Sequence, residues 1–438
     1  MASLQTSTPP RPAPADTAIA SSESPEALVA RRARAGRAAQ GRLARMSDAE
    51  KAAALISAAG ALRADEALIL AANARDLAAG EANGLSAALL DRLRLTPERL
   101  AGIADAVAQV AALPDPVGQT IDEAKRPNGL NLRRVRVPIG LIGIIYESRP
   151  NVTADAAALC LRSGNAVLLR GGSEAVHSNH AILAALSRGL AEAGAPAEAV
   201  QLVPTQDRAV VGAMLTAAGL IDMIVPRGGK SLVARVQADA RVPVLAHLDG
   251  ICHTYVHAKA DPDMAVAIAM NAKLRRTGIC GAMETLLLDT AFPASGQVVA
   301  ALLDAGCELR GDARACALDP RILAASAEDW DTEYLDAILS VAVVDGLEAA
   351  CAHIDAHSSR HTDVIVTEDA AAADSFIACV DSAIVMVNAS SQFADGGEFG
   401  LGAEIGIATG RLHARGPVAL EGLTTYKWVV RGTGQLRP

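Results

Sequence analysis

Between residues 138 and 246 the sequence alternates short apolar runs with segments of helical length, and this rhythm constrains the fold more than any other feature. Repeated strand, helix, strand units of this size predict a parallel, doubly wound sheet that binds ligands at the carboxyl ends of its strands. The predicted strands are 141–146, 166–170, 200–203, 222–225 and 242–246, and the predicted helices are 154–162, 174–193, 206–218 and 230–240.

A second alternation of the same kind runs from residue 254 to residue 387, and 438 residues are too many for one ordinary core. Residues 26–112 show helical spacing and predict four or five helices, whereas 130–137 and 423–431 alternate like strands of an antiparallel ribbon. The expected division is a disordered Pro-rich tail at 1–25, a dinucleotide-type domain at 26–250 to which 388–438 returns as a ribbon, and a second α/β domain at 251–387. Such a ribbon either adds an edge strand to another subunit or packs on its own domain.

The amino-acid composition argues against nucleic acid and membrane surfaces as partners. Aromatic residues make up 2% of the chain and the formal net charge is −9, so neither base stacking nor a general attraction to nucleic acid or anionic lipid is expected. Seven cysteines are spread along the chain without metal-ligand spacing, which indicates a reducing, cytoplasmic setting. No run of 18 uncharged apolar residues predicts a membrane span.

One cysteine stands out. Cys280 follows a helix-like polar run and lies between Gly278 and Gly281, with Lys273, Arg275 and Arg276 just upstream. Nearby positive charge favours a thiolate, which attacks carbonyl carbon readily. The alternative is a buried, inert cysteine beside the solvated end of a helix.

Two predicted strands end in glycine-rich turns that suit phosphate. One turn is Arg170, Gly171, Gly172, Ser173 and Glu174; the other is Gly228, Gly229, Lys230 and Ser231 at the start of a helix. An ordinary strand-to-helix turn explains either one alone, but two in neighbouring units favour a nucleotide. A third glycine string, 400–406, has the wrong spacing for a dinucleotide fingerprint and follows no clean strand–helix unit.

Six strings, in this order along the chain, together resemble the gamma-glutamyl phosphate reductase family of the aldehyde dehydrogenase superfamily. They are 138–153 (PIGLIGIIYESRPNVT), 168–175 (LLRGGSEA), 225–230 (VPRGGK), 277–280 (TGIC), 284–287 (ETLL) and 398–406 (EFGLGAEIG). The resemblance covers about residues 26–432. It implies an aldehyde dehydrogenase-like α/β fold, with two doubly wound domains and a β-ribbon oligomerisation element, and therefore a homo-oligomer.

The resemblance also assigns roles. It makes Cys280 the nucleophile and Asn151 the side-chain oxyanion donor. It places NADPH on the two glycine turns, with Arg170 at the adenosine ribose and Glu333 at the nicotinamide ribose. Its implied substrate is gamma-glutamyl phosphate, delivered by a glutamate kinase and reduced through a thioester in proline biosynthesis. The candidate substrate-binding residues are Arg149, Arg275, Arg276, Ser358, Arg360 and His361.

One departure from the superfamily bears on mechanism. Hydrolytic members carry a water-activating Glu in a Glu-Leu-Gly-Gly string, whereas this chain reads HLDGICH at 247–253. Without that base, a thioester is spared from water, as a reductase of acyl phosphates requires. Asp249 is the first substitute for the missing acid. The competing interpretations are a hydrolytic or other acylating aldehyde dehydrogenase, a cysteine acyltransferase or hydrolase that uses His253, a metal site or dyad at Cys252 and His253, and a non-catalytic scaffold.

Overall fold

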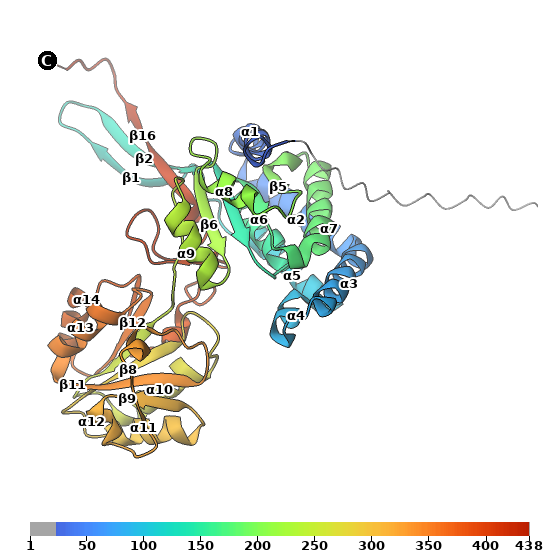
Figure 1. Cartoon of the computed structure of the whole chain (residues 1–438). Helices are drawn as coiled ribbons and strands as arrows, with labels where there is room; N and C mark the ends of the chain where they lie inside the picture. Colours follow the sequence, from blue (N-terminus) through green and yellow to red (C-terminus); the bar gives the residue numbers. More distant parts are fainter. Residues whose placement is uncertain (1–22, 438) are drawn as a thin grey trace, which may run out of the picture.

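The computed structural model describes residues 23–437. Of the predicted disordered tail, residues 1–22 lie outside the described part of the chain. The predicted tail ends too late, because the first helix already starts at Pro25. The Ser24 side chain caps this helix by accepting from the Ala27 N–H. Two lobes and a projecting ribbon make up the molecule (Figure 1).

Five helices come first, at the upper end of the predicted number. They are α1 (Pro25–Leu43), α2 (Asp48–Ala64), α3 (Glu66–Ala82), α4 (Ala87–Leu93) and α5 (Pro97–Ala112). Ser47 and Glu50 form a reciprocal capping box at the start of α2. Small residues allow close packing in this lobe: a side chain at Gly189 would overlap the backbone of α2 at Ala58.

The first parallel sheet has the order β5-β4-β3-β6. Every residue of β3 is buried, because helices cover both faces of the sheet. The elements are β3 (Leu141–Tyr146), α6 (Asn151–Arg162), β4 (Ala166–Arg170), α7 (Val176–Glu192), β5 (Val200–Leu202), α8 (Ala209–Leu215), β6 (Met223–Arg227) and α9 (Lys230–Asp239).

The expected strand at 242–246 is wrong. This segment forms only an isolated bridge between Ile224 and Val244, with Leu245 N–H donating to the Ile224 carbonyl at 2.9 Å. A longer ladder would need N–H groups from Pro243 before this bridge and from Pro226 after it, and proline has none. The predicted helix at 206–218 is also shorter than expected, since α8 covers Ala209–Leu215.

The second lobe is a parallel sheet in the order β10-β9-β11-β8-β7-β12-β13. Its central strands β7, β8 and β12 are buried along their whole length, and its separate apolar cores flank them. The elements are β7 (Cys252–Val256), α10 (Pro262–Leu274), β8 (Met283–Asp289), α11 (Ser295–Asp304), β9 (Glu308–Gly311), α12 (Ala313–Cys316), β10 (Leu323–Ala324), β11 (Ile338–Val344), α13 (Gly346–His357), β12 (Thr362–Val366), α14 (Ala370–Cys379) and β13 (Ile384–Val387).

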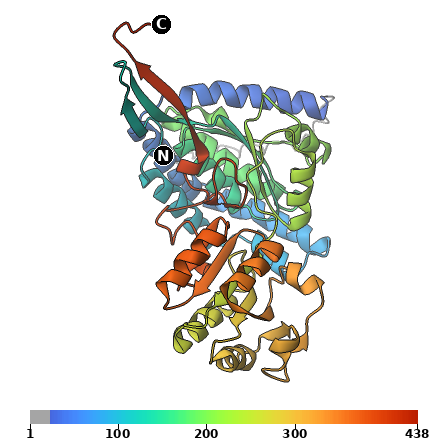
Figure 2. The ribbon, with the colours of Figure 1, turned by 90° about the vertical axis from the view of Figure 1, so that its left-hand side faces the viewer.

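A three-stranded antiparallel ribbon, in the order β1-β2-β16, leaves the first lobe. Figure 2 shows it projecting beyond α1, with the C-terminus near its tip. Its strands are β1 (Thr120–Lys125), β2 (Asn131–Pro138) and β16 (Thr424–Arg431), and a small hairpin of β14 (Ile407–Ala408) and β15 (Gly416–Pro417) precedes β16. The predicted α/β fold with two sheets and a ribbon is thus confirmed. Among residues 23–437, no helix is long and apolar enough to cross a membrane.

Candidate active site

Cys280 lies in the short loop between α10 and β8, where three segments meet. Gly250, just before β7, packs so tightly on this loop that a side chain there would overlap the backbone of Cys280. The Gly250 N–H donates to Glu333 Oε1 at 2.9 Å. Cys252 Sγ donates to the Cys280 carbonyl at 3.2 Å. The segment with Gly250 and Cys252 therefore holds the Cys280 loop. Glu333, a candidate from the sequence, accepts from that same segment.

The Cys280 thiol is harder to ionise than expected. Burial, together with the carboxylates of Glu333 and Glu404, raises its pKa to about 11, and Arg227 opposes this rise. The expectation that its surroundings favour a thiolate is therefore wrong for the protein without ligands.

The three basic residues upstream of Cys280 explain the error. Lys273 is fully buried and its Nζ lies 2.5 Å from Glu284 Oε2, so its charge is neutralised inside the lobe. Arg275 donates to Gln392 Oε1 at 3.3 Å. Arg276 is exposed, and its charge reaches Arg149 on the first lobe: loss of hydration and nearby arginines, including Arg276, lower the pKa of Arg149. Of these three residues only Arg276 faces the other lobe.

Two histidines lie against the thiol. One nitrogen each from His247 and His361, with the sulfur of Cys280, all lie within 4.8 Å of one another. The two rings meet edge to face, with centroids 5.2 Å apart. His253, the predicted dyad partner, is instead buried on β7 with Nδ1 3.2 Å from Asp363 Oδ1. The histidines beside the thiol are thus His247 and His361, and not His253.

Asn151 is the first residue of α6, and its amide is oriented by a carboxylate. Asn151 Nδ2 donates to Asp155 Oδ2 at 2.8 Å, one turn further along the helix. Burial raises the pKa of Asp155 to about 6. An amide nitrogen carries two hydrogens, so this bond fixes the side chain and leaves one N–H free for another acceptor.

The turn between β6 and α9 already holds a negative group. The Gly229 N–H donates to Glu147 Oε2 at 2.9 Å, and Gly228 leaves room for the same carboxylate. Lys230 pairs with Asp249 at 3.0 Å, while Ser231 is exposed on the first turn of α9. The free N–H groups at this helix N-terminus therefore suit an anion, as the sequence predicts.

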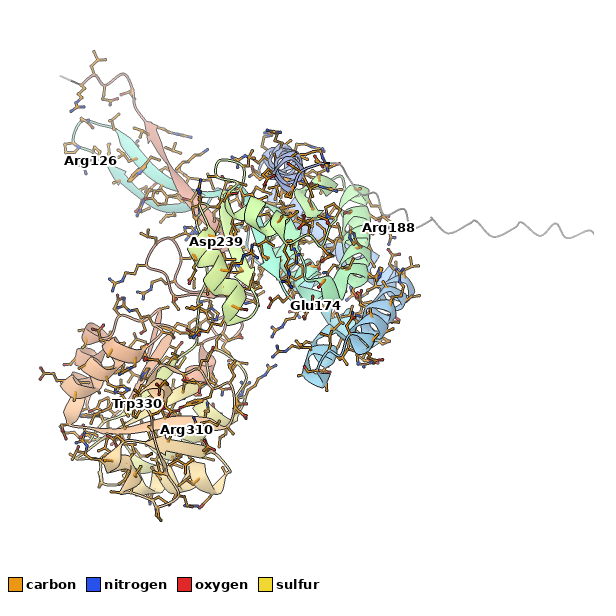
Figure 3. The ribbon with its side chains drawn as sticks, viewed as in Figure 1. Arg126, Glu174, Arg188, Asp239, Arg310 and Trp330 are labelled. Carbon is orange, nitrogen blue, oxygen red and sulfur yellow. The ribbon has the colours of Figure 1, made fainter. Side chains whose placement is uncertain are left out.

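The other predicted cofactor turn follows β4. A side chain at Gly171 would overlap Asn179, and one at Gly172 would overlap Glu174. Glu174, labelled in Figure 3 on the first lobe, accepts from Ser148 Oγ at 2.9 Å. Ser173 is exposed beside it.

Arg170 ends β4 and donates to the carbonyls of Gly171 and Gln206 at 2.9 and 3.1 Å. Burial lowers the pKa of Arg170, Glu174 and Asp207 oppose this, and the charges of Arg208 and Arg235 lower it further. Three arginines and two carboxylates therefore act on one another beside this turn.

Two predicted substrate residues are placed away from the thiol. Ser358 donates to the buried carboxylate of Asp363 at 2.7 Å. Arg360 is exposed and lines a separate cavity of about 390 Å³ with Ser359 and Gln237. No described contact joins either side chain to Cys280.

Arg227 is the main residue that sequence reasoning missed. It ends β6, and its charge lowers the pKa of Cys280, Asp155 and His247. Glu404, whose carboxylate accepts from the Gly396 N–H at 2.9 Å, was missed as well. Arg227 lies in the string 225–230 and Glu404 in the string 398–406, both of which resemble the family. Arg227 could have been found from the sequence, because it ends a predicted strand and ligands bind at such ends.

This chain is similar to known proteins in sequence and in fold. The aldehyde dehydrogenase family profile matches residues 6–306. Gamma-glutamyl phosphate reductase of Novosphingobium aromaticivorans is 76% identical over 94% of this chain and 97% of its own length. The Sphingopyxis alaskensis protein of the same name is 71% identical over 97% of this chain and 99% of its own length.

Solved structures extend the comparison to three dimensions. Gamma-glutamyl phosphate reductase of Thermotoga maritima has a TM-score of 0.92 and 41% identity, and the match covers 94% of this chain and 100% of that one. An acetylating aldehyde dehydrogenase from Geobacillus thermoglucosidasius, with 16% identity, a TM-score of 0.65 and coverage of 94% and 98%, shares the fold. The chain belongs to the aldehyde dehydrogenase family and, within it, to the gamma-glutamyl phosphate reductases, oxidoreductases of proline biosynthesis.

Proposed function

We propose that this protein reduces L-glutamate 5-phosphate to L-glutamate 5-semialdehyde with NADPH and releases phosphate, through a thioester on Cys280. The observation that carries the proposal is the convergence on Cys280 of Gly250, Glu333 and Arg227, from segments that the sequence keeps apart. The relatives' name supplies the substrate class. We further propose that a glutamate kinase delivers the acyl phosphate, which is labile in water.

In the first step the Cys280 sulfur attacks the acyl carbon. The new S–C bond forms as the C–O bond to phosphate breaks, and phosphate leaves with the bond's electrons while the thiol proton passes to solvent. The charges of Arg227 and Arg276 both act on Arg149, and together these three arginines favour an anionic substrate at this junction. Arg275, Ser358 and Arg360 are weaker candidates for substrate contact, because their described partners are other protein groups or the lining of a cavity at Ser359 and Gln237. His361 lies against the thiol and stays a candidate.

Asn151 serves as a donor to the oxyanion that develops on the acyl oxygen. Its free amide N–H is available because the other bonds to Asp155 at 2.8 Å. A pre-oriented donor needs no reorganisation when charge develops, which is the basis of such stabilisation.

The two glycine turns fit NADPH. The Glu147 carboxylate, which accepts from the Gly229 N–H, occupies a position suited to a pyrophosphate oxygen and has to move aside for it. The NADPH preference is proposed from the family; the charges of Arg170, Arg208 and Arg235 suit its 2′-phosphate, although Glu174 and Asp207 offset part of them and Glu174 alone would favour a free ribose hydroxyl. Glu333 is the candidate for the nicotinamide ribose. When bound, NADPH supplies the hydride that converts the thioester to the aldehyde.

Water is a poor competitor for the thioester. His247 stands where hydrolytic relatives carry their carboxylate base, and its Nδ1 is engaged by the Ile407 carbonyl at 2.8 Å. Burial lowers the pKa of His247, and burial lowers that of His361 to about 3, so both are weak proton acceptors. Asp249, the other candidate base, is paired with Lys230 at 3.0 Å.

We propose the two domains that the sequence predicts. Residues 26–250 with 388–438 form the domain that binds the dinucleotide, and residues 251–387 form the domain that carries the nucleophile. The ribbon is proposed to join copies of the chain. Tyr426, Trp428 and Val430 share one face of its edge strand β16 and are 47%, 57% and 54% exposed. All seven cysteines lie in the described residues and are free thiols, which supports a cytoplasmic enzyme.

The reaction is testable in the oxidative direction by absorbance at 340 nm, with glutamate 5-semialdehyde, phosphate and either NADP⁺ or NAD⁺. We expect faster reduction of NADP⁺, and loss of at least 99% of the activity in Cys280→Ser. Cys379→Ser, an exposed thiol at the end of α14, is the matched control and should keep full activity. A Cys280→Ser enzyme with a tenth of wild-type activity would remove this residue from the nucleophile role.

A further inference from the structure

The geometry around the Cys280 sulfur points to a second use of the same group. We propose that Cys280, His247 and His361 form a binding site for a borderline-soft divalent cation such as Zn²⁺, and that its occupancy reversibly blocks the enzyme. Cation binding does not depend on the proposed reaction and is measured without substrate.

The three ligand atoms lie within 4.8 Å of one another. Tetrahedral zinc, with bonds of about 2.0 Å to nitrogen and about 2.3 Å to sulfur, places its ligand atoms about 3.3–3.7 Å apart. The difference is about 1 Å, which side-chain rotation can close because Cys280 and His247 are only half-buried. Two nitrogens and a sulfur are also a donor set that zinc prefers, and one position stays open for water.

Both imidazoles are oriented as zinc ligands are. His247 Nδ1 lies 2.8 Å from the Ile407 carbonyl, and a carbonyl can only accept, so Nδ1 carries the proton and Nε2 keeps its lone pair. His361 Nδ1 lies 2.9 Å from Thr362 Oγ1. The bond to the carbonyl fixes the tautomer of His247, as such bonds do for metal-binding histidines, whereas the Thr362 hydroxyl can donate or accept and only holds the His361 ring in place.

A buried nitrogen without a hydrogen-bond partner is the second observation. His361 is fully buried, and its Nε2 has no hydrogen-bond partner within residues 23–437. An unpaired polar atom in the interior is costly unless something coordinates it.

The bound cation would stop catalysis through the nucleophile. Coordination replaces the thiol proton by the metal, so one proton is released and the sulfur lone pair is no longer free to attack carbon. Chelation of the cation restores the thiol unchanged, because no covalent bond of the protein is broken.

The test is direct binding to the full-length, metal-free enzyme. Zn²⁺ is titrated in competition with a chromophoric chelator, and Co²⁺ is used as an optical probe of sulfur ligation. We expect one tight site per chain, a sulfur-to-cobalt absorption band, and inhibition by Zn²⁺ that excess chelator reverses. Cys280→Ser should abolish the band, and His247→Gln should weaken Zn²⁺ binding at least about tenfold.

Matched controls use a thiol and an imidazole elsewhere. Cys379→Ser and His177→Gln, on the exposed end of α14 and the first turn of α7, should bind Zn²⁺ as the wild type does. His247→Gln is the main variant, because His361 is buried and its replacement could prevent folding. Equal Zn²⁺ affinity in the wild type and Cys280→Ser, or loss of the site in Cys379→Ser, would overturn the proposal, as would no binding by the wild type at micromolar Zn²⁺.

Discussion

The reactivity of Cys280 should respond in opposite directions to two charges that flank it. Its pKa rises from the ordinary 9.0 to about 11, mainly through burial and then through Glu333 and Glu404, while Arg227 lowers it. A rise of about two in pKa corresponds to about 3 kcal/mol and to a roughly hundredfold smaller thiolate fraction at pH 8. Burial is the largest cause, so Glu333→Gln should restore only part of the lost thiolate. We expect the thiolate fraction to rise about two- to tenfold.

The assay is the rate of alkylation by iodoacetamide, without substrate or cofactor and resolved by mass spectrometry to the Cys280 peptide. Only the thiolate reacts, so the rate follows ionisation and should keep rising to about pH 11. We expect Glu333→Gln to accelerate the reaction at pH 8 and Arg227→Gln to slow it by a comparable factor.

Glu81→Gln, on the exposed side of α3, is the control for the loss of a distant carboxylate and should leave the rate unchanged. The exposed Cys379 provides an internal reference in every digest. A slower reaction in Glu333→Gln, or a faster one in Arg227→Gln, would refute this electrostatic description of the thiol.

Three further outcomes are expected. Asn151→Ala should lower the turnover rate by about 10²- to 10³-fold with little change in KM, and an effect on KM alone would make Asn151 a binding residue. Lys273→Met leaves the buried Glu284 without its partner, so urea unfolding should show a loss of about 3–5 kcal/mol, largely recovered when Glu284→Leu is added; an unchanged midpoint would contradict the buried pair. Trp428→Asp should reduce the mass measured by light scattering at equal concentration, whereas an unchanged mass would place the subunit contact elsewhere.

Periodicity and turn chemistry predict most of the fold here. Both sheets and the ribbon follow from the alternation of strands and helices, and the main failure, at 242–246, traces to Pro243 and Pro226. Prolines at these places are visible in the sequence, but whether a neighbouring ladder needs their N–H groups is not.

The site was less predictable. Cys280 and the glycine turns stand out locally. His247 lies beside the thiol, and the charges of Arg227 and Glu404 act on it, only because the fold brings distant segments together. The expected thiolate failed for a related reason: the sequence shows the charge of Lys273 but not that the fold buries it against a carboxylate.

The central claim is a thioester on Cys280 that phosphate, and not water, releases. One measurement tests it most directly: enzyme, NADP⁺ and glutamate 5-semialdehyde are mixed without phosphate, and NADPH and the mass of the Cys280 peptide are followed together. We predict a burst of about one NADPH per active site, an acyl adduct on Cys280, and sustained turnover only when phosphate is added. Sustained NADPH formation without phosphate, or a burst that leaves Cys280 unmodified, would contradict the account.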